Sequence, residues 1–366
     1  MLPALRSQKI AILYQALAPP VIDGIRKDAK PGGYSDSGAD IAFCLRAAGL
    51  DVLTPTPVPD PTEALDWVFA DSHQGIEAAL RSGATVLWAN TVLFQGHPIE
   101  TAMHDCWIVG QSPEATQRVD DKFATNALLR GRGLPVAVSI VTSSAGGAGM
   151  IRLESLTPEL LGAQGLRFPL IVKPVRGRGS QGVTLVESFA AFQLASHELL
   201  SSARFGDGLI VEQYLAGEEL TVTVMPRGAD HKQPWALPPV RRFNHVHGVA
   251  PYNGTVAVTA NSELLTEEQM RQPSVSAMLD ACAEAATIVG ARAPIRIDCR
   301  SDGVVLRLFD LNMKPNMTGA GRPGREDQDS LSVLAARGLG WTYESLLKMM
   351  LADAWREGTA GVVFLT

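Results

Sequence analysis

A glycine-rich loop with a lysine just ahead of it is the first feature of this chain whose residues could take part in chemistry. The loop reads GRGSQG over residues 177–182, and Lys173 lies four residues before it in IVKPV. Glycine-rich backbone offers N–H donors with no side chains in the way, and a lysine neutralises phosphate charge. These residues alone leave two interpretations open: a hairpin that covers phosphates, or a plain surface hairpin with a solvated lysine.

The same six residues match the G-x-G-x-x-G pattern of dinucleotide-binding loops, but the segment after them does not. A dinucleotide loop is followed by a helix, because the pyrophosphate sits on the N-terminus of that helix. Here GVTLVES (182–188) follows, and its alternating valines and threonine predict a strand. We therefore expect a hairpin tip, which argues against a nicotinamide-dependent oxidoreductase.

Two short polar patterns form a second chemical feature. Arg296 and Asp298 are two residues apart in IRID, and Asp310 and Asn312 are two apart in FDLN. Side chains two apart share one face of a strand, and a turn near Gly303 would place Arg296 roughly opposite Asp310. Converging carboxylate and amide oxygens suit Mg²⁺. The alternative is a solvated face with a surface salt bridge, but the apolar half of these strands predicts burial, and a buried acidic cluster needs a counter-ion.

The elements that must position these motifs divide the chain into an α/β part and an α+β part. Up to about residue 118, apolar runs alternate with helical patterns, which predicts a doubly wound parallel sheet. Beyond 119, helices and strands follow in a mixed order. PGGYSDSGAD (31–40) reads as a loop in which Ser35 or Ser37 caps the next helix, and 226–262 reads as a long functional loop. The expected strands are 9–17, 51–59, the end of 77–90, 168–175, 182–188, 208–215, 219–225, 293–300 and 304–312.

Composition excludes several classes of protein. The chain has 366 residues and a net charge of −6, so a nucleic-acid-binding surface is not expected as its main feature. Its four cysteines form no C-x-x-C pair, which predicts reduced thiols in a cytoplasmic protein. The sequence contains no run of 18 apolar residues, so a membrane span is not expected.

In this order and spacing, the motifs resemble those of the ATP-grasp ligases, and within them the D-alanine–D-alanine ligase family, over about residues 119–350. The resemblance implies a Rossmann-like domain at 1–118, a central ATP-grasp subdomain at 119–208 and a C-terminal subdomain with a metal site at 209–366. It also implies ATP and Mg²⁺, or Mn²⁺, as cofactors. The expected phosphate contacts are Lys122 in DKFAT, Lys173 in IVKP, and Gly179, Ser180 and Gly182 in the loop.

The resemblance also assigns the adenine hinge and the metal hairpin. In VEQYLAGEE, Glu212 would bind the adenine amine, Gln213, Tyr214 and Leu215 would line the hinge, and Glu219 would bind the ribose hydroxyls. Asp298, Asp310 and Asn312 would hold the metal, with Asp310 where the family has glutamate. Arg296 is expected to be catalytic by stabilising an oxyanion. KPNMT (314–318) resembles the family's S-P-G-M-T.

The substrate end departs from the family pattern. Arg322 and Arg325 in GAGRPGRED either bind an acidic group of the substrate or pair with Glu326, Asp327 or Asp329. Asp36 and Ser37 are partial stand-ins for the family residues that grip the first amino group. Residues 238–254 are expected to form a lid, from which Arg241, Arg242, His245 and His247 could reach phosphate or substrate. Tyr252 in that lid and Ser180 in the glycine-rich loop are both expected to be catalytic residues, with Tyr252 hydrogen-bonded to substrate.

The function implied by this resemblance is an ADP-forming ligase that joins a carboxylate and an amine through an acyl phosphate. D-Alanine is not expected as its substrate. An ATP-dependent kinase on the same fold is the alternative, and a nucleotide carrier that has lost its chemistry is a third possibility. The expected partners are a small carboxylic acid and an amine, in a homodimer that binds neither nucleic acid nor membrane.

Overall fold

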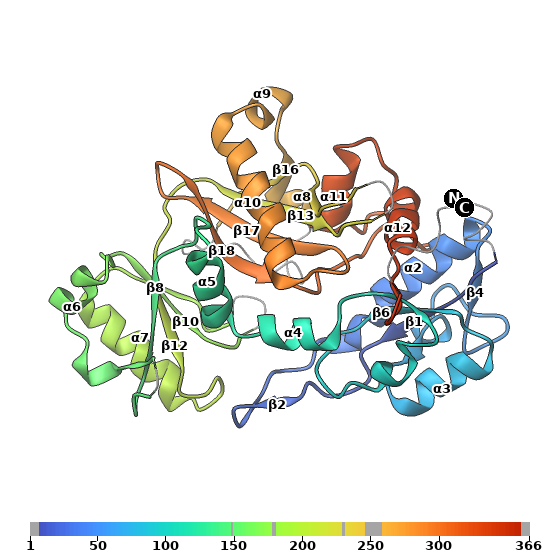
Figure 1. Ribbon diagram of the computed structural model, residues 1–366, viewed down its shortest axis with the longest axis horizontal. Helices are drawn as coiled ribbons and strands as arrows, with labels where there is room; N and C mark the ends of the chain where they lie inside the picture. Colours follow the sequence, from blue (N-terminus) through green and yellow to red (C-terminus); the bar gives the residue numbers. More distant parts are fainter. Residues whose placement is uncertain (1–6, 148, 178–180, 229–230, 246–257, 360–366) are drawn as a thin grey trace.

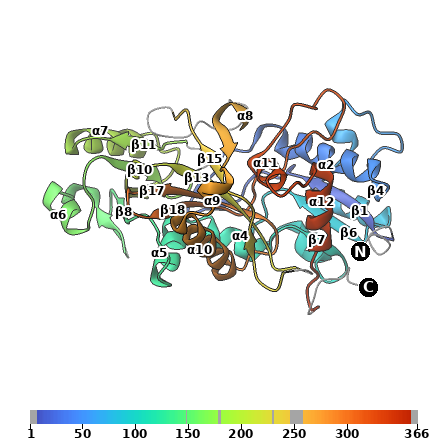
Figure 2. The same cartoon turned by 90° about the horizontal axis from the view of Figure 1, so that it is seen from above.

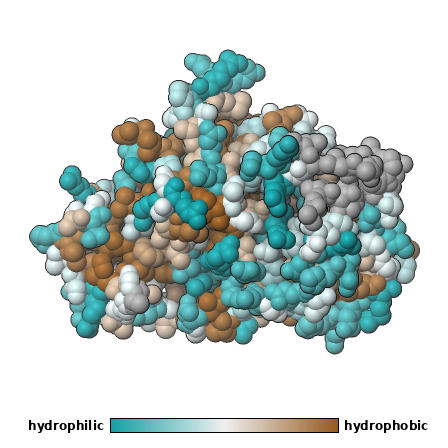
Figure 3. Space-filling model, in the orientation of Figure 1, coloured by the Kyte–Doolittle hydropathy of each residue, from teal (hydrophilic) through white to brown (hydrophobic). Residues whose placement is uncertain are grey.

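The structure of the protein is a computed structural model that describes residues 7–359 apart from 148, 178–180, 229–230 and 246–257. Three large sheets follow one another along the chain (Figure 1). The N-terminal sheet lies at the right of this view, the central sheet at the left and the C-terminal sheet between and above them. On the same face, hydrophilic residues cover α9 (Glu267–Met270) at the top of the molecule (Figure 3).

The first sheet is parallel and carries helices on both faces. In β1 (Lys9–Tyr14), Ile10 and Ile12 enter the core that contains α2 (Ser35–Ala47). Ala11 enters the opposite core with α3 (His73–Arg81). Because successive strand residues face opposite sides, this sheet needs continuous apolar strands, and the predicted doubly wound domain is confirmed. The strand order is β4 (Asp51–Leu53), β1, β6 (Val86–Asn90) and β7 (Trp107–Val109), with β5 (Phe69–Ala70) also paired to β1.

The central sheet contains the glycine-rich hairpin. The strand predicted after the GRGSQG loop is present as β11 (Thr184–Val186), which pairs antiparallel with β10 (Leu170–Pro174). No helix follows the loop directly, so the prediction against a dinucleotide loop is confirmed. The order is β11, β10, β12 (Leu209–Gln213), β8 (Ser139–Ser143) and β9 (Ile151–Arg152), with α6 (Pro158–Ala163) and α7 (Phe189–Ser201) packed around it.

The C-terminal sheet carries the predicted metal hairpin. Its order is β16 (Ser262–Leu264), β15 (Val240–Arg242), β13 (Glu219–Met225), β17 (Ile295–Ser301) and β18 (Leu306–Asn312), with β14 (Trp235–Ala236) also paired to β13. The long helix α10 (Pro273–Val289) packs its buried face on this sheet. The expectation of one long loop over 226–262 is wrong, because β14, β15 and α8 (Val258–Asn261) lie in that range.

The chain passes from the central sheet to the C-terminal sheet slightly later than the expected boundary at 208/209. β12 pairs with β10 and β8, so the described change from the central to the C-terminal sheet falls between Gln213 and Glu219. The chain then returns to the N-terminal domain: α12 (Tyr343–Ala352) packs beside α2 (Figure 2), and Trp355 exchanges two backbone hydrogen bonds with Ile108. The first and last parts of the chain therefore share one core.

The start of α2 differs from the expectation of a serine cap. The N-cap residue is Tyr34, which has a left-handed backbone with φ of 66° and makes no side-chain cap. Gly32 and Gly33 before it also have positive φ, at 68° and 54°. Both candidate serines lie inside the helix, so the capping prediction is wrong. This turn places the Tyr34 ring at the cavity described below.

The remaining elements are short or connect the three sheets. They are β2 (Val21–Ile22), β3 (Ile25–Arg26), α4 (Pro113–Val119), α5 (Lys122–Gly131), α11 (Leu331–Arg337) and the 3₁₀ turns Pro31–Tyr34, Ala64–Asp66, Pro98–Ala102 and Leu153–Ser155.

Among the residues that the structure describes, no helix combines the length and the apolar composition needed to cross a membrane.

Candidate active site

A cavity of about 400 Å³ lies where the three sheets approach one another. Its walls include Tyr34 from the N-terminal domain, Lys173 from the central sheet and Asp298 from the C-terminal sheet. Motifs separated by more than a hundred residues are thus brought to one place. The predicted site residues that line it are Lys122, Lys173, Glu212, Gln213, Tyr214, Leu215, Glu219, Arg296, Asp298, Asp310 and Asn312.

The two predicted phosphate lysines are held by carboxylates. Lys173 on β10 donates to Oε1 of Glu212 on β12 at 2.6 Å, and both side chains are buried. Lys122, the first residue of α5, forms an ion pair with Asp310 on β18. Burial opposes both charges of this second pair, but their mutual attraction outweighs it. The pKa of Lys122 therefore lies above its ordinary value and the pKa of Asp310 below.

Glu212 has one oxygen that the protein leaves unsatisfied. Its Oε2 is buried and receives no hydrogen bond within the described part of the chain. Burial raises the pKa of Glu212 even though the Lys173 ammonium opposes the shift. A buried acceptor without a donor is costly, so this oxygen is suited to a donor group supplied by a ligand.

The metal hairpin has a different register from the predicted one. Asp298 lies directly opposite Asp310, and Arg296 lies opposite Asn312, so the expected pairing of Arg296 with Asp310 is wrong. A bulge next to Asp298 leaves Phe309 without a direct partner and shifts the register beyond it. The bulge places the two carboxylates in a cross-strand pair, where like charges repel without a cation between them.

The side chains of Asp298, Asp310 and Asn312 fit a hard cation whose coordination is completed by ligands from outside the protein. In the described residues, no group of three or more His, Cys, Asp or Glu side chains is arranged to hold a metal. Two carboxylates and one amide are too few for a closed protein site. Mg²⁺ is commonly bound by one or two carboxylates together with water and substrate phosphate oxygens, and this donor set matches that preference.

Arg296 is fixed by its own strand. Its Nε and Nη2 donate to the two oxygens of Asp298 at 3.2 and 3.1 Å, and Thr221 on β13 donates to the same carboxylate at 2.7 Å. A guanidinium held in a two-point contact keeps one orientation. Its remaining N–H groups can therefore serve as positioned donors in the cavity.

Glu219 at the far end of the hinge also has basic side chains beside it. His245 Nε2 lies 2.8 Å from its Oε2, and Arg300 lies 3.8 Å from the same oxygen. The lid residue Arg241 instead pairs with Glu218 and Glu263, while Arg242 lines the cavity. Gln181 and Val183 line the cavity on either side of Gly182. Gly179, Ser180, Tyr252 and His247 lie outside the described residues.

The four predicted substrate residues are not in the cavity wall. Ser37 is buried, donates to the Tyr34 carbonyl at 3.1 Å and accepts from Asn90 at 3.0 Å. Asp36 is on the outer side of α2 and pairs with Arg322 at 3.2 Å. In the described structure, both residues therefore bind other protein groups, and neither lines the cavity.

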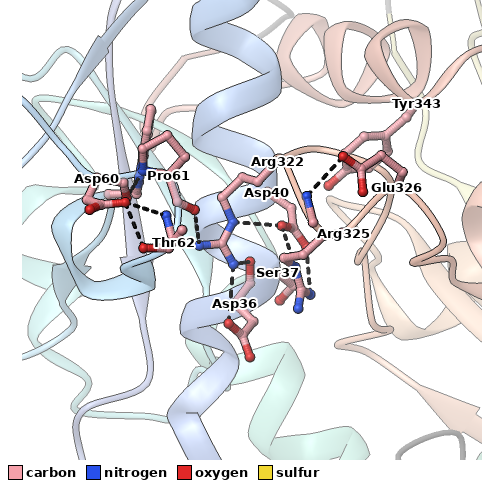
Figure 4. A network of polar contacts seen from close by, with 12 residues as sticks. Asp36, Ser37, Asp40, Asp60, Pro61, Thr62, Arg322, Arg325, Glu326 and Tyr343 are labelled. Carbon is pink, nitrogen blue, oxygen red and sulfur yellow. Dashed lines mark hydrogen bonds and ion pairs between the residues drawn. The ribbon is translucent and has the colours of Figure 1, made fainter.

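Arg322 and Arg325 converge on one carboxylate of α2 (Figure 4). Asp40 is fully buried and accepts from Arg322 Nε at 2.9 Å and from Arg325 Nε and Nη2 at 2.8 and 2.9 Å. The expected alternative partners Glu326, Asp327 and Asp329 do not hold these arginines. Glu326 accepts from the Gly324 N–H, and Asp329 pairs with Arg337. This cluster joins the loop after the metal strand to the N-terminal domain.

The sequence did not predict two lysines that line the cavity beside Tyr34, a residue of the N-terminal domain. The ammonium groups of Lys30 and Lys314 lie 4.1 and 4.3 Å from the centre of the Tyr34 ring. Lys314 also donates to Oδ1 of Asn90 at 2.8 Å. The signal for Lys314 was visible in KPNMT, where the family pattern has serine, but its neighbours come from residues more than 200 positions away.

Comparisons with known proteins agree with this geometry. The family profile described as D-ala D-ala ligase C-terminus matches residues 130–352. The D-alanine--D-alanine ligase of Actinobacillus succinogenes is 29% identical over 356 residues, which cover 95% of this chain and 98% of the relative. That of Ectopseudomonas mendocina is 30% identical over 241 residues, covering 64% of this chain and 65% of the relative.

Solved structures show the same fold at low identity. A D-alanine--D-alanine ligase from Bacillus anthracis, complexed with ATP, has a TM-score of 0.65 at 14% identity and covers 94% of this chain and 96% of its own. The VanG D-Ala:D-Ser ligase from Enterococcus faecalis has a TM-score of 0.60 at 14% identity, covering 94% of this chain and 98% of its own.

The fold and the cavity define an ATP-grasp enzyme, an ATP-dependent carboxylate–amine ligase. The chain belongs to the D-alanine–D-alanine ligase family, whose profile covers more than half of it. Ligases of this type use ATP and Mg²⁺.

Proposed function

We propose that this enzyme activates a small carboxylic acid with ATP, forms an acyl phosphate and joins the acyl group to an amine with release of ADP. The observation that carries the proposal is the convergence of Lys122, Lys173, Asp298 and Asp310 on one cavity between three sheets. Phosphoryl transfer depends mainly on positioning and on neutralised charge, and this cavity offers cations and metal ligands together.

The nucleotide would lie between the central and C-terminal sheets. Oε2 of Glu212 is a buried acceptor without a donor, which suits the exocyclic amine of adenine. The hinge residues Gln213, Tyr214 and Leu215 continue from it along the cavity wall, and Glu219 at its end would accept from the ribose hydroxyls. Gly179, Ser180 and Gly182 remain candidates for phosphate contacts from the hairpin loop.

The metal would be held by Asp298, Asp310 and Asn312. When bound, Mg²⁺ supplies positive charge to the phosphate oxygens during transfer. The protein's own contribution is to place cations on both sides of the reacting group. Lys122 and Lys173 would orient the phosphates, and Arg296, fixed by Asp298, would donate to the oxyanion of the tetrahedral intermediate when the amine attacks.

A substrate other than D-alanine is part of this proposal. The residues expected to stand in for the family's amine grip, Asp36 and Ser37, point to protein partners rather than to the cavity. We also assign Arg322 and Arg325 a positioning role through Asp40 in place of direct substrate contact. Ser180 and Tyr252 keep their proposed substrate contacts, and a homodimer is proposed from the family resemblance.

An assay that separates acid activation from amine transfer tests the function. Purified enzyme with Mg²⁺ and ATP is given a panel of carboxylic acids, with and without amines, and ADP and product masses are measured. We expect ADP release to rise when an amine joins the acid, with an amide of matching mass. A stable phosphorylated product without amine would support the kinase instead. ATP binding without any ADP release would support the carrier. Membership in a ligase family favours the first outcome.

A further inference from the structure

We infer that the hairpin of β2 and β3, with Asp28 after it, is a strap that ties the N-terminal domain to the central subdomain, the central sheet with α6 and α7. It keeps the cavity closed while the activated acid waits for the amine. The inference rests on the proposed ligase function and assigns positioning residues to it. The contacts that carry it are the ion pairs of Asp23 and Asp28 and the packing of Ile25.

The hairpin is too small to hold its own position. β2 and β3 have two residues each and form a separate two-stranded sheet. Val21, Asp23 and Arg26 are exposed, while Ile22 and Ile25 are half-buried. An isolated two-stranded hairpin is marginally stable in water, so its place depends on what it docks against. Figure 1 shows it reaching from the N-terminal domain toward the central sheet.

The tip of the hairpin is a tight turn that fixes Asp23. Ile22 pairs with Ile25, so Asp23 and Gly24 are the two loop residues, and their φ values are 52° and 78°. Asp-Gly is a preferred sequence for the type I′ turn, which requires this backbone. The Asp23 carboxylate is thereby presented at the point of the strap, where it accepts from Nε of Arg176 at 3.2 Å.

Arg176 connects the strap to the glycine-rich loop, because it directly precedes Gly177. Its Nη2 lies 3.1 Å from Oδ2 of Asp23, and its Nη1 donates to Oδ2 of Asp120 at 3.1 Å. Asp120, which follows α4, also forms an ion pair through Oδ1 with Lys27 at the end of β3. The start of the loop is therefore held by the strap and by the end of α4 together.

A second anchor lies at the base of the strap. Asp28 forms an ion pair with Arg204, in the segment between α7 and β12. Two residues further along that segment, a Cβ at Gly206 would lie 3.0 Å from Cγ1 of Ile25, so the hairpin closely approaches the backbone there. Tip and base are thus both attached to the central subdomain, which restricts its movement away from the N-terminal domain.

The strap forms part of the cavity wall, since Ile22, Ile25 and Lys27 line the cavity. If water reached the acyl phosphate, its oxygen would bond to the acyl carbon, the bond from that carbon to the phosphate oxygen would break, and phosphate and a proton would leave with the acid regenerated. In the productive step the amine nitrogen forms the new bond, phosphate leaves and the amine proton passes to solvent. A closed wall favours the productive step because it excludes water from a reactive intermediate.

The anchoring pairs are weak enough to open after each turnover. Asp23 is 79% exposed, and about half of each side chain in the Asp28–Arg204 pair is exposed. Exposed ion pairs are individually weak, and salt screens them. The strap therefore holds the closed arrangement without trapping the product.

Nucleotide release tests the strap without knowledge of either substrate. The full-length enzyme with Mg²⁺ is loaded with N-methylanthraniloyl-ATP, and the dissociation rate is measured by stopped-flow fluorescence after mixing with excess ATP. Asp23→Asn removes the charge but keeps a residue that favours the same turn. We expect it to raise the rate about two- to fivefold, and Arg176→Gln about tenfold because the contact with Asp120 is also lost. Arg271→Gln removes an exposed pair at α9 and is the matched control, which should leave the rate unchanged.

A charge exchange at the second anchor separates a strap from a general loss of stability. Arg204→Glu and Asp28→Arg should each raise the dissociation rate about two- to fivefold, because like charges then face each other. The double variant restores an ion pair of opposite direction and should return the rate to within about twofold of the wild type. Urea unfolding of the same proteins reports their stability separately.

Coupling of the two chemical steps is the second measurement. Hydroxylamine serves as the amine and acetate, glycine or D-alanine as the acid, and hydroxamate formed per ADP released is determined. The ratio should fall at least about twofold in Asp23→Asn, because acyl phosphate is then lost to water. Higher salt should lower the ratio in the wild type as well.

The possible contradictions are distinguishable. Unchanged dissociation rates in Asp23→Asn and in both single exchange variants would overturn the inference. A faster rate in Arg176→Gln alone would also overturn it, and would indicate that Arg176 contacts the nucleotide directly from the cavity wall. ADP release with none of the acids would count against the proposed function, while the dissociation rates would still decide whether the strap holds the cavity closed.

Discussion

Nζ of Lys173 lies 2.6 Å from Oε1 of Glu212, and the two side chains are only 6% and 4% exposed. The pair joins neighbouring strands β10 and β12 of the central sheet at the cavity wall. A buried ion pair contributes little net stability relative to apolar residues, but removal of one partner leaves an uncompensated charge. Stability and chemistry at this pair can therefore be separated by single and double variants.

Lys173→Met should destabilise the protein by about 3–5 kcal/mol, because Glu212 is left buried and charged. Lys173→Met with Glu212→Leu should recover at least half of that loss, since both charges are then gone. Both variants should lack acid-dependent ADP release. Urea unfolding gives the free energies and ADP assays the activity. Recovery of activity in the double variant would remove both residues from the proposed nucleotide site.

Asp310 and Asp298 face each other across the hairpin, and the proposed metal site depends on both. Asp310→Asn removes one negative ligand and frees Lys122 from its ion pair. We expect the Mg²⁺ concentration for half-maximal ADP release to rise by at least about tenfold. Asp327→Asn, at an exposed position outside the cavity, is the control. A Mg²⁺ dependence that is unchanged in Asp310→Asn would exclude this carboxylate as a ligand.

The hairpin also shows how far the sequence could predict the site. Alternation of polar and apolar residues was enough to place Arg296 and Asp298 on one face, because that periodicity is local. The predicted register was wrong by two residues. One residue comes from the turn, where Ser301 pairs with Leu306, and the other from the bulge at Phe309, which has no local sequence mark. The strand after GRGSQG was predictable for the same local reason, through its β-branched residues.

Long-range partners were not predictable from the sequence. The two arginines at 322 and 325 were identified as unusual, but their partner Asp40 lies in α2, more than 280 residues earlier. Nothing in the local pattern of α2 distinguishes Asp40 from a solvated helix residue. Its role depends on packing of the C-terminal loop against the N-terminal domain, which only the folded structure shows.

That packing predicts different effects for two variants of the same cluster. Asp40→Asn leaves the buried Arg322 with only the exposed carboxylate of Asp36 and should cost about 3–5 kcal/mol of unfolding free energy. Arg325→Met should cost less, because Asp40 keeps its bond to Arg322 and Arg325 is 24% exposed. Thermal and urea unfolding measure both. A positioning role predicts little change in acid KM for Arg325→Met at permissive temperature, whereas a large KM increase with normal stability would restore direct substrate binding.

Asp71 supports the segment that precedes the cavity residues Pro19 and Pro20. Its fully buried carboxylate accepts from the backbone N–H groups of Ala16 and Leu17 and from Thr91. His97 accepts from the Ile99 N–H through Nδ1, so its Nε2 carries the proton and donates to Asp71 at 3.2 Å. Burial alone would raise the pKa of Asp71, but these hydrogen bonds outweigh it and hold the pKa below its ordinary value.

The sign of the pH effect follows from that direction. A carboxyl group with a depressed pKa in the folded state adds stability above its unfolded pKa of about 3.9, and loses it as pH falls through the folded pKa. Asp71→Asn should therefore be less stable than the wild type by about 2–3 kcal/mol from pH 6 to 8. The gap should shrink as the pH falls below about 4. A gap that is constant with pH would show that the charge of Asp71 is not what stabilises this segment.

Gly33 tests whether the turn before α2 is required in its observed form. Its φ is +54°, and a Cβ there would lie 2.0 Å from the Gln15 carbonyl oxygen, which a real contact cannot tolerate. Gly24 has a similar φ of +78° but nothing within 4 Å of such a Cβ, so it reports the cost of the backbone alone. We expect Gly24→Ala to cost about 1–2 kcal/mol and Gly33→Ala clearly more, measured by urea unfolding. Equal losses of stability in the two variants would show that the close approach of residue 33 to the Gln15 carbonyl relaxes at no further cost.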